Sequence, residues 1–316
     1  MSKTTTEALR GFAILAIIFS HIGYSLGYSF LYPLSILGGV AVNLFLFLSG
    51  FGVAASSLSK NLPPLDFYKK RLKKLFLPMW VVLTIYLLLD YVVLQRTYST
   101  ASIVQNFCGF FPRADLFTNV NSPLWYFSLI FYYYLIFPLF LLKKIRPLSP
   151  VLMLIFTYLL LQQNLPVHRD VINLYKLHFI SFPLGVFLAL FLNRWPITAI
   201  NIKNIVKAPL LAVLIFVFLY TAVNSHVAAD PKIEQSVSII TMLSLVSTFL
   251  LLNWQAKIFN LFGKYSYEIY LLHWPILSRY DLFYQNFPAS LATLLYLALF
   301  IALAWLLNKI IKIVCA

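Results

Sequence analysis

Arg10 and His21 are the two residues of the first apolar stretch whose side chains could do chemistry. Eleven residues at ~100° each come to about three helical turns, so in a helix the two side chains share one face, roughly 16 Å apart along the axis. Ionisable side chains within membrane-spanning helices are costly and by default mark functional sites. The spacing predicts a functional pair. The alternative is that His21 only bonds a neighbouring helix and Arg10 only marks a helix end.

Arg71 and Lys74 form a second pair, within the basic stretch 69–74 that leads into an apolar run. Because they are three residues apart, they share a face of a helix. Guanidinium and ammonium groups pair well with phosphate oxygens, so the pair suits a phosphate-rich ligand. The alternative is a basic anchor that contacts anionic lipids.

Glu268 and His273 lie inside another apolar run, about 7 Å apart along a helix axis. Five residues turn a helix by ~140° beyond a full turn, so the two side chains are not expected to act on one ligand together. His273 precedes Trp274 and Pro275, and the alternative is a structural histidine bonded to carbonyls that the proline leaves free.

The composition identifies the elements that must position these residues. Of 316 residues, 61% are hydrophobic and 10% are charged, far from the balance of soluble domains. Apolar runs long enough to cross about 30 Å of hydrocarbon predict an all-α polytopic membrane bundle of about ten transmembrane helices. The runs cover residues 11–29, 34–56, 75–94, 123–142, 148–163, 175–193, 207–224, 236–252, 265–281 and 289–308.

The positive residues predict the orientation of this bundle. Over ten alternating spans, 18 of the 24 Lys and Arg residues fall on one side and the remaining 6 on the other. The richer side is expected in the cytoplasm, with both termini, and the first apolar segment is expected to remain as a membrane helix. The poorer side holds Arg96, Arg113, Arg169, Lys176, Lys232 and Arg279.

Several functional classes are not expected. The net charge of +15 comes from short loops rather than from a basic soluble face, which argues against nucleic-acid binding. Cys108 and Cys315 have no partner at metal-ligand spacing, so no metal site is expected. The chain shows no fixed repeat and no polar linker, and residues 1–316 are expected to form one domain.

Five sequence blocks, in this order, resemble the acyltransferase-3 family of integral-membrane acyltransferases, and the resemblance covers nearly the whole chain. The blocks are Leu9-Arg10-Gly11-x-Ala13 to His21, Gly39-Val40-Ala41-Val42-Asn43-Leu44-Phe45 to Ser49-Gly50-Phe51, Phe67-Tyr68 to Arg71-x-x-Lys74 to Pro78, Leu124-Trp125 to Pro138, and Ser266-Tyr267 to His273-Trp274-Pro275.

The resemblance implies an enzyme that transfers an acyl group, acetyl above all, from cytoplasmic acyl-CoA to a hydroxyl of a cell-surface or lipid-linked carbohydrate. It implies a multi-pass protein of the inner (cytoplasmic) membrane, in contact with membrane lipids. His21 matches the family's essential histidine, while Arg10, Arg71 and Lys74 match its donor-binding cations. The substrate-binding residues assigned from the same blocks are Asn43, Trp125, Glu268 and His273.

The chain also departs from the family pattern. Lys74 replaces a second arginine, which keeps the charge but loses the bidentate fork. Ile130 and Phe131 stand where many members have glutamates, and Asn43 stands where an acidic residue is frequent. A carboxylate role therefore cannot be transferred to these positions.

Acyl transfer needs a base near the attacking hydroxyl and a positive environment for the donor phosphates. His21 is expected to act either as that base or as an acyl carrier. One rival hypothesis is a transporter or flippase of a polysaccharide export pathway, although few intramembrane charges are available for a proton-coupled carrier. Another is a non-catalytic lipid-binding scaffold, with Arg10 and His21 facing lipid.

Overall fold

The computed structural model describes residues 1–34, 37–60, 63–114, 116–140, 146–195, 204–224, 231–252 and 256–315, and every regular element in these ranges is a helix. The predicted all-α class is confirmed. The α-helices are α1 Lys3–Ser20, α2 Leu37–Lys60, α3 Pro64–Leu94, α4 Thr100–Phe107, α5 Trp125–Phe140, α6 Ser149–Leu160, α7 Arg169–His178, α8 Ser181–Arg194, α9 Asn204–Asn224, α10 Pro231–Leu252, α11 Lys257–Lys264, α12 Ser266–Pro275 and α13 Ala289–Cys315. Two π-helices, η1 His21–Ser25 and η5 Ile276–Tyr280, continue α1 and α12, and three short 3-10 helices are η2 Ser29–Leu34, η3 Ser122–Leu124 and η4 Arg146–Leu148.

Each predicted apolar run contains a helix, but their lengths differ. Among the described residues, six stretches are long and apolar enough to cross a membrane: Lys3–Gly23, Leu37–Ser59, Pro64–Leu94, Arg169–Arg194, Pro231–Leu251 and Ala289–Ile313. Shorter apolar helices cover Trp125–Phe140, Arg146–Leu160 and Ala208–Thr221. The protein is therefore of the multi-pass membrane type, while the number of ten spans and the orientation stay predictions. Lys143, Lys144 and Lys203, which contribute to the predicted orientation, lie outside the described residues.

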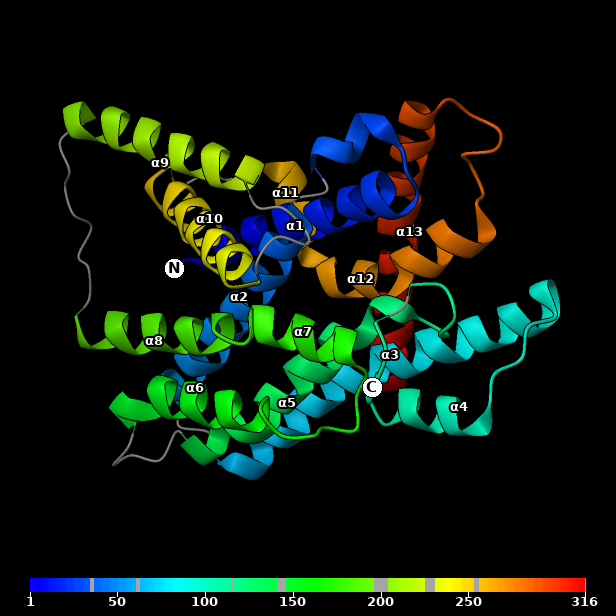
Figure 1. Cartoon of the computed structure of the whole chain (residues 1–316), viewed down its shortest axis with the longest axis horizontal. Helices are drawn as coiled ribbons and strands as arrows, with labels where there is room; N and C mark the ends of the chain where they lie inside the picture. Colours follow the sequence, from blue (N-terminus) through cyan, green and yellow to red (C-terminus); the bar gives the residue numbers. More distant parts are fainter. Residues whose placement is uncertain are drawn as a thin grey trace. The chain divides into compact units, whose positions relative to one another are not determined.

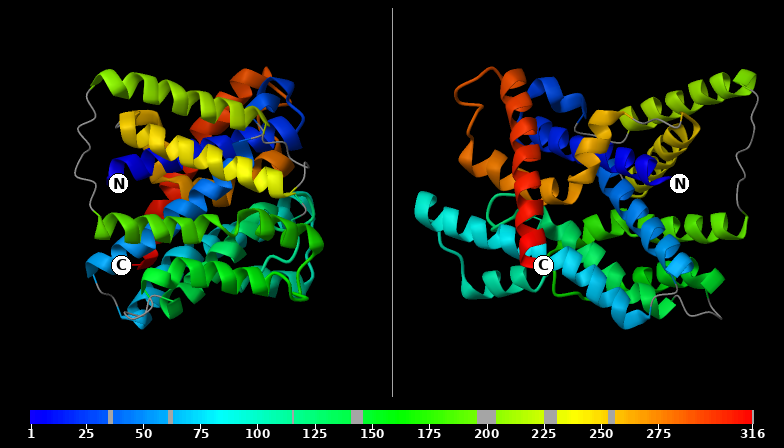
Figure 2. Two further views of the ribbon diagram at one scale, coloured as in Figure 1. Left: turned by 60° about the vertical axis from the view of Figure 1, so that its left-hand side comes forward. Right: turned by 180° about the vertical axis from the view of Figure 1, so that it is seen from behind.

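The chain forms two compact units. The first unit comprises Met1–Leu62, Leu139–Asn164 and Asn173–Lys264, and the second comprises Pro63–Pro138, Leu165–Ile172 and Tyr265–Ala316. In the first unit, α1 packs on α2 and α11, α2 packs on α8, and α9 runs beside α10 (Figure 1). In the second unit, the long helix α13, red in Figure 2, packs on α12 and α3.

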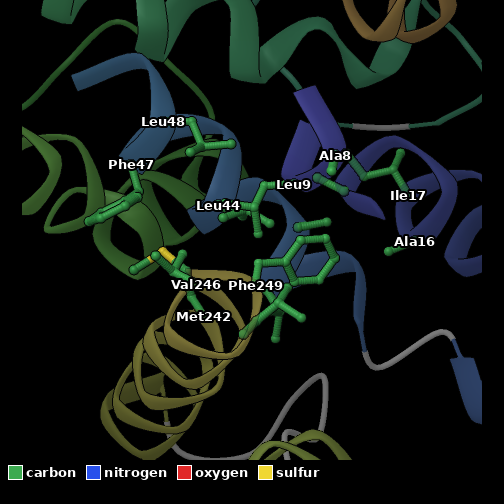
Figure 3. Close-up of a cluster of buried hydrophobic side chains, with 14 residues drawn as sticks. Ala8, Leu9, Ala16, Ile17, Leu44, Phe47, Leu48, Met242, Val246 and Phe249 are labelled. Carbon is green, nitrogen blue, oxygen red and sulfur yellow. The ribbon is translucent and has the colours of Figure 1, made fainter. Parts of the chain in front are cut away.

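The core of the first unit is an apolar cluster from three helices. Figure 3 shows Leu9 of α1, Leu44 of α2 and Phe249 of α10 gathered at its centre, all at most 1% exposed. Alanines of α1 at Ala13 and Ala16 share this face, so the helices approach closely. The cluster fixes which side of α1 faces inward, and hence where the polar residues of α1 and α2 lie.

Glycines allow the closest helix contacts of the first unit. A Cβ at Gly11 of α1 would lie 1.8 Å from the carbonyl oxygen of Phe259, and one at Gly263 of α11 would lie 1.7 Å from that of Glu7. No side chain fits at either position, so the backbones of α1 and α11 touch here. Small residues at helix contacts are typical of membrane proteins, because they let backbones approach. Gly11, next to Arg10, is thus a packing residue.

A second pair of glycines joins α2 and α8. A Cβ at Gly50 would lie 2.1 Å from the carbonyl oxygen of Phe182, and one at Gly185 would lie 2.0 Å from that of Phe47. The two contacts are reciprocal, because Phe182 lies three residues before Gly185 and Phe47 lies three residues before Gly50. This crossing sets the register of α2 against α8.

The second unit is organised around α12, whose Pro275 cannot donate to the carbonyl of Leu271. Asn121 Nδ2 donates to that carbonyl over 2.7 Å, and Tyr86 OH donates to the carbonyl of Leu272 over 2.5 Å. Side chains of neighbouring segments thus replace the backbone bonds that the proline disrupts, as apolar surroundings require.

Tyrosine hydroxyls also donate to carbonyls near the other two interior helix prolines described in this unit. Tyr267 OH donates to the carbonyl of Leu75, three residues before Pro78 of α3. Tyr68 OH donates over 2.7 Å to the carbonyl of Leu135, three residues before Pro138 of α5. Part of the large tyrosine content therefore serves hydrogen bonding between helices, in addition to apolar packing.

The glycine crossing of α2 and α8 can be tested with a matched pair of substitutions. Gly50→Ala should lower the thermal unfolding midpoint in detergent clearly, because the added Cβ meets the Phe182 carbonyl and overpacking costs about 1–3 kcal/mol or more. Gly52→Ala, on the same helix, should leave the midpoint unchanged or raise it, since no atom lies within 4 Å of its Cβ position. Equal midpoints for the two variants would contradict the crossing.

Candidate functional site

His21 lies where α1 changes from an α-helix to a π-helix. Its backbone is still helical, and its N–H donates to the carbonyls of Ile17 and Ile18. The carbonyl of His21 then accepts from Leu26 over 3.1 Å, the five-residue spacing of a π-helix. Short π-helical turns are frequent at functional sites. The half-buried imidazole is thus placed at a local irregularity of an otherwise regular helix.

Arg10 lies on the same unbroken helix, so the interval of roughly 16 Å along the axis between Arg10 and His21 is kept. Its side chain is half-buried, and among the described residues it has no ion-pair or hydrogen-bond partner. The nearby Glu7 pairs with Lys3 instead, at 3.7 Å. Arg10 is therefore a partly desolvated cation that no residue of the described chain neutralises, which suits an anionic ligand.

Asn43 is fully buried on α2 and forms two side-chain hydrogen bonds. Its Oδ1 accepts from His178 Nδ1 at 2.8 Å and from Ser181 Oγ at 2.7 Å. His178 ends α7 and Ser181 begins α8, so the α2–α8 crossing next to Phe182 brings these groups together. Sequence reasoning singled out Asn43 but not its partners; a histidine and a serine three residues apart in an apolar segment are the only local signal.

Arg71 rests on aromatic rings. Its guanidinium carbon lies 5.9 Å from the ring centres of both Phe67 and Tyr134, and Phe67 stacks on Phe137 at 5.4 Å. None of its N–H groups donates to a described residue, so the rings hold the guanidinium while its donors stay available. Lys74, one turn further along α3, is exposed. Arg71 and Lys74 together could hold phosphate groups, as the pair of cations in the sequence predicts.

The polar residues of α12 are bonded within the second unit. Glu268 accepts from Asn308 Nδ2 of α13 at 2.9 Å. His273 Nδ1 lies 2.9 Å from the carbonyl of Tyr270 and 3.2 Å from that of Ile269, so the histidine bonds to its own helix. The geometry matches the structural alternative for His273, with the difference that the carbonyls are those of the preceding turn rather than the one Pro275 leaves free.

Trp125 begins α5 and is 9% exposed. Further along α5, Ile130 is 3% exposed and the ring of Phe131 packs edge-on against Phe76 at 4.9 Å. The two positions where relatives carry glutamates are therefore apolar packing sites in this chain. No carboxylate replaces them on this part of α5.

A buried ion pair joins α3 to η5, and sequence reasoning missed it. Arg279 donates to the carboxylate of Asp90, which is fully buried, and to the backbone carbonyls of Asn119 and Val120. Tyr280 donates to the same carboxylate at 2.7 Å. The available signal was a lone acid and a lone base inside two apolar runs, but only packing shows that they meet.

Tyr98, just after α3, completes this cluster. Its hydroxyl lies 2.5 Å from Asp90 Oδ2 and 3.1 Å from Arg279. Burial, reinforced by the hydrogen bond to Asp90, raises the pKa of Tyr98 to about 12. The phenol therefore keeps its proton at neutral pH and acts as a donor to the carboxylate.

The predicted site residues divide between the two units. Arg10, His21 and Asn43 belong to the first unit, and the remaining residues, from α3, α5 and α12, belong to the second: Arg71, Lys74, Trp125, Glu268 and His273. In the part of the chain that the structure describes, no group of His, Cys, Asp and Glu residues could hold a metal ion. The predicted site residues carry imidazole, cationic, amide, indole and carboxylate groups.

Comparison with known proteins gives one match. A family model described as an acyltransferase domain matches residues 6–309, which take in most of both units. No curated protein and no solved structure matches the chain significantly.

The ion pair between α3 and η5 should stabilise the protein only while both partners are present. Arg279→Met leaves the Asp90 charge buried and should lower the free energy of unfolding by about 3–5 kcal/mol, since breaking a buried pair strands one charge. Adding Asp90→Asn should recover part of the loss. Arg113→Met, at an exposed arginine, should be neutral. Urea unfolding in detergent measures all three, and a neutral Arg279→Met would refute the structural role.

Proposed function

The chain belongs to the acyltransferase-3 family, and from this premise we propose that it transfers an acyl group, acetyl above all, from cytoplasmic acyl-CoA to a hydroxyl of a cell-surface or lipid-linked carbohydrate. The family and the apolar helices make it a membrane acyltransferase. The observation that carries the proposal is the family match over residues 6–309, which spans both compact units. We propose that the two units together form the single family domain, in the inner membrane.

In this proposal His21 acts at the acyl group, as a base for the hydroxyl or as a carrier that forms a transient acyl-imidazole. The π-helical turn that begins at His21 supports a functional role, because regular packing alone does not require it. The hydroxyl oxygen bonds to the acyl carbon as the bond from carbon to the CoA sulfur breaks. The hydroxyl proton ends on the sulfur, which gives an ester and CoA thiol.

We propose that the donor phosphates pair with cations, for which Arg10 in the first unit and Arg71 and Lys74 in the second are the candidates. The proposal is supported by two features: Arg10 has no ion-pair partner in the described chain, and Arg71 presents its donors above the rings of Phe67 and Tyr134. Charge-assisted bonds from such groups to phosphate are the stronger class of hydrogen bond. Trp125 and Asn43 remain our candidates for contact with the acceptor.

Glu268 and His273 have hydrogen bonds that account for them structurally, to Asn308 and to the carbonyls of α12. Substitution there is expected to affect folding before it affects turnover. We therefore propose that Glu268 and His273 support substrate binding indirectly, by holding α12 in place.

The role of His21 can be tested in cells. His21→Ala should reduce ester-linked acyl groups on the surface glycan at least about 100-fold, which is the low end of what a general base contributes. His168→Ala is the matched control, since this exposed histidine pairs with Asp170 at 2.7 Å and should leave acylation unchanged. Unchanged acylation by a folded His21→Ala protein would refute the proposal.

Donor binding gives an independent test with purified protein. Arg71→Ala should weaken the binding of acetyl-CoA about tenfold or more in calorimetry, because hydrogen bonds to charged groups contribute about 1.5–3 kcal/mol. Lys74→Arg should tighten binding, since it supplies a bidentate fork. Lys73→Ala is the control, an exposed cation of the same helical turn. Equal losses of acetyl-CoA affinity for Arg71→Ala and Lys73→Ala would show that any positive charge at this turn has the same effect. That result would contradict a specific role of Arg71.

A further inference from the structure

Five consecutive backbone carbonyls of the second unit each accept a hydrogen bond from a side chain of another segment. They belong to residues 116–120, which form no regular secondary structure and precede η3. Trp274 Nε1 donates to the first carbonyl, that of Leu116, over 2.5 Å. Arg96 donates to the next two over 2.9 and 2.6 Å, and Arg279 donates to the last two. We call residues 116–120 the strap, because side chains from the end of α3, from α12 and from η5 hold it in place.

The exposed side of the strap is expected to face water or lipid headgroups. Irregular backbone is not found facing the acyl chains of a bilayer, because its polar groups need partners that lipid cannot supply. Arg96 is only half-buried, and a guanidinium is likewise costly in hydrocarbon. In the predicted orientation, Arg96 and Arg279 both lie on the side opposite the cytoplasm. A surface glycan would be met on that side.

Phe117 presents an aromatic ring on this exposed side of the strap. The residue is 53% exposed, and its ring packs edge-on against the ring of Trp274, with the ring centres 5.8 Å apart. Its carbonyl is bonded by Arg96, whose guanidinium carbon lies 5.1 Å from the ring centre of Tyr98. The backbone and the ring of Phe117 are therefore both held, although loop residues are usually mobile. A side chain held in this way loses little conformational entropy when it binds a ligand.

The segments that hold the strap are themselves irregular. Arg279 belongs to the π-helix η5, and Asp281, directly after this helix, has a φ of 32°. Gln95, directly before Arg96, has a φ of 52°. Residues other than glycine rarely adopt a positive φ, because their side chains make it costly. Both π-helical turns and such strained residues are concentrated at functional sites, so the surroundings of the strap point to a function beyond packing.

An exposed aromatic ring with polar neighbours suits a sugar ring. One face of a pyranose consists of C–H groups that can pack on an aromatic ring, while the hydroxyls at its edge donate and accept hydrogen bonds. Thr118 and Asn119, which follow Phe117 in the strap, carry a hydroxyl and an amide. These groups can both donate and accept. Binding sites for small ligands combine aromatic surface with a few polar groups in this way.

We propose that the strap binds a sugar ring of the carbohydrate acceptor, with Phe117 packing on its apolar face and Arg96 acting as a positioning residue that holds the strap. The inference rests on the proposed acyl transfer. It adds a contact for the acceptor within the second unit. The strap is followed by η3 and then by Trp125, so the new contact precedes, in the chain, the residue already proposed to meet the acceptor.

The test measures transfer kinetics with the full-length protein in membranes. The donor is acetyl-CoA, and the acceptor probes are the unacylated surface glycan and the lipid-linked glycan of cells that lack the gene. Phe117→Leu keeps an apolar side chain but removes the ring, and it should raise the apparent KM for the acceptor at least about fivefold, with kcat and acetyl-CoA affinity within about twofold of wild type. Phe117→Tyr retains the ring and should lose much less. Phe287→Leu is the matched control, since Phe287 is 42% exposed and lies outside the strap.

Arg96 gives a second variant that does not alter the ring. Arg96→Gln frees two carbonyls of the strap but leaves the ion pair of Asp90 and Arg279 in place, and it should raise the same KM. Arg96→Lys should recover part of the loss, and Arg113→Gln, at an exposed arginine, should have no effect.

Three results would overturn the inference: an unchanged acceptor KM in Phe117→Leu, an equal rise in Phe117→Leu and Phe117→Tyr, or an equal loss of acetyl-CoA affinity. The first is expected if Phe117 only contacts the membrane surface or a second copy of the chain. If the wild-type protein transfers acetyl to neither acceptor, the proposed function fails. That outcome is distinct from a fully active Phe117→Leu enzyme, which would refute the role of the strap alone.

Discussion

Polar groups in apolar surroundings need partners, and this constraint accounts for much of the structure. Water is not available inside a bilayer to replace a missing hydrogen bond, and each unpaired group costs several kcal/mol. Helix prolines create such groups at Pro78, Pro138 and Pro275, and nearby tyrosine hydroxyls donate to carbonyls three residues before each. At Pro275 the freed carbonyl is that of Leu271, which takes its donor from Asn121, so this proline requires a neighbouring segment in the second unit.

The same constraint distinguishes polar groups whose hydrogen bonds lie within their unit from those that we propose as ligand contacts. The carboxylate of Asp90 has an arginine and two phenols as partners, and Glu268 has an amide, so both are accounted for by bonds within their unit. Arg10 and Arg71 have no such partners in the described chain, and Asn43 keeps one buried donor unused. The unused donors of Arg10, Arg71 and Asn43 are the ones that the ligands we propose would pair.

The sequence predicts the helices better than it predicts the contacts between them. Hydropathy located the helices, because the backbone groups of each apolar run must form their hydrogen bonds within that run. Positive charge singled out Arg71 and Lys74. Lengths were less predictable, since α6 and α12 are shorter than a bilayer crossing needs. The Asn43–His178 bond joins residues 135 apart in the chain, and its formation depends on glycine contacts between α2 and α8. Spacing along one helix carries no information about such pairs.

The amide at position 43 suits its position beside the buried ring of His178. A carboxylate beside His178 would favour the charged imidazolium, and charged groups are costly inside an apolar helix bundle. A neutral amide orients the ring through Oδ1 and keeps Nδ2 as a donor. Asn43 in place of an acid therefore fits a buried, uncharged environment, as do Ile130 and Phe131 of α5, which provide apolar packing.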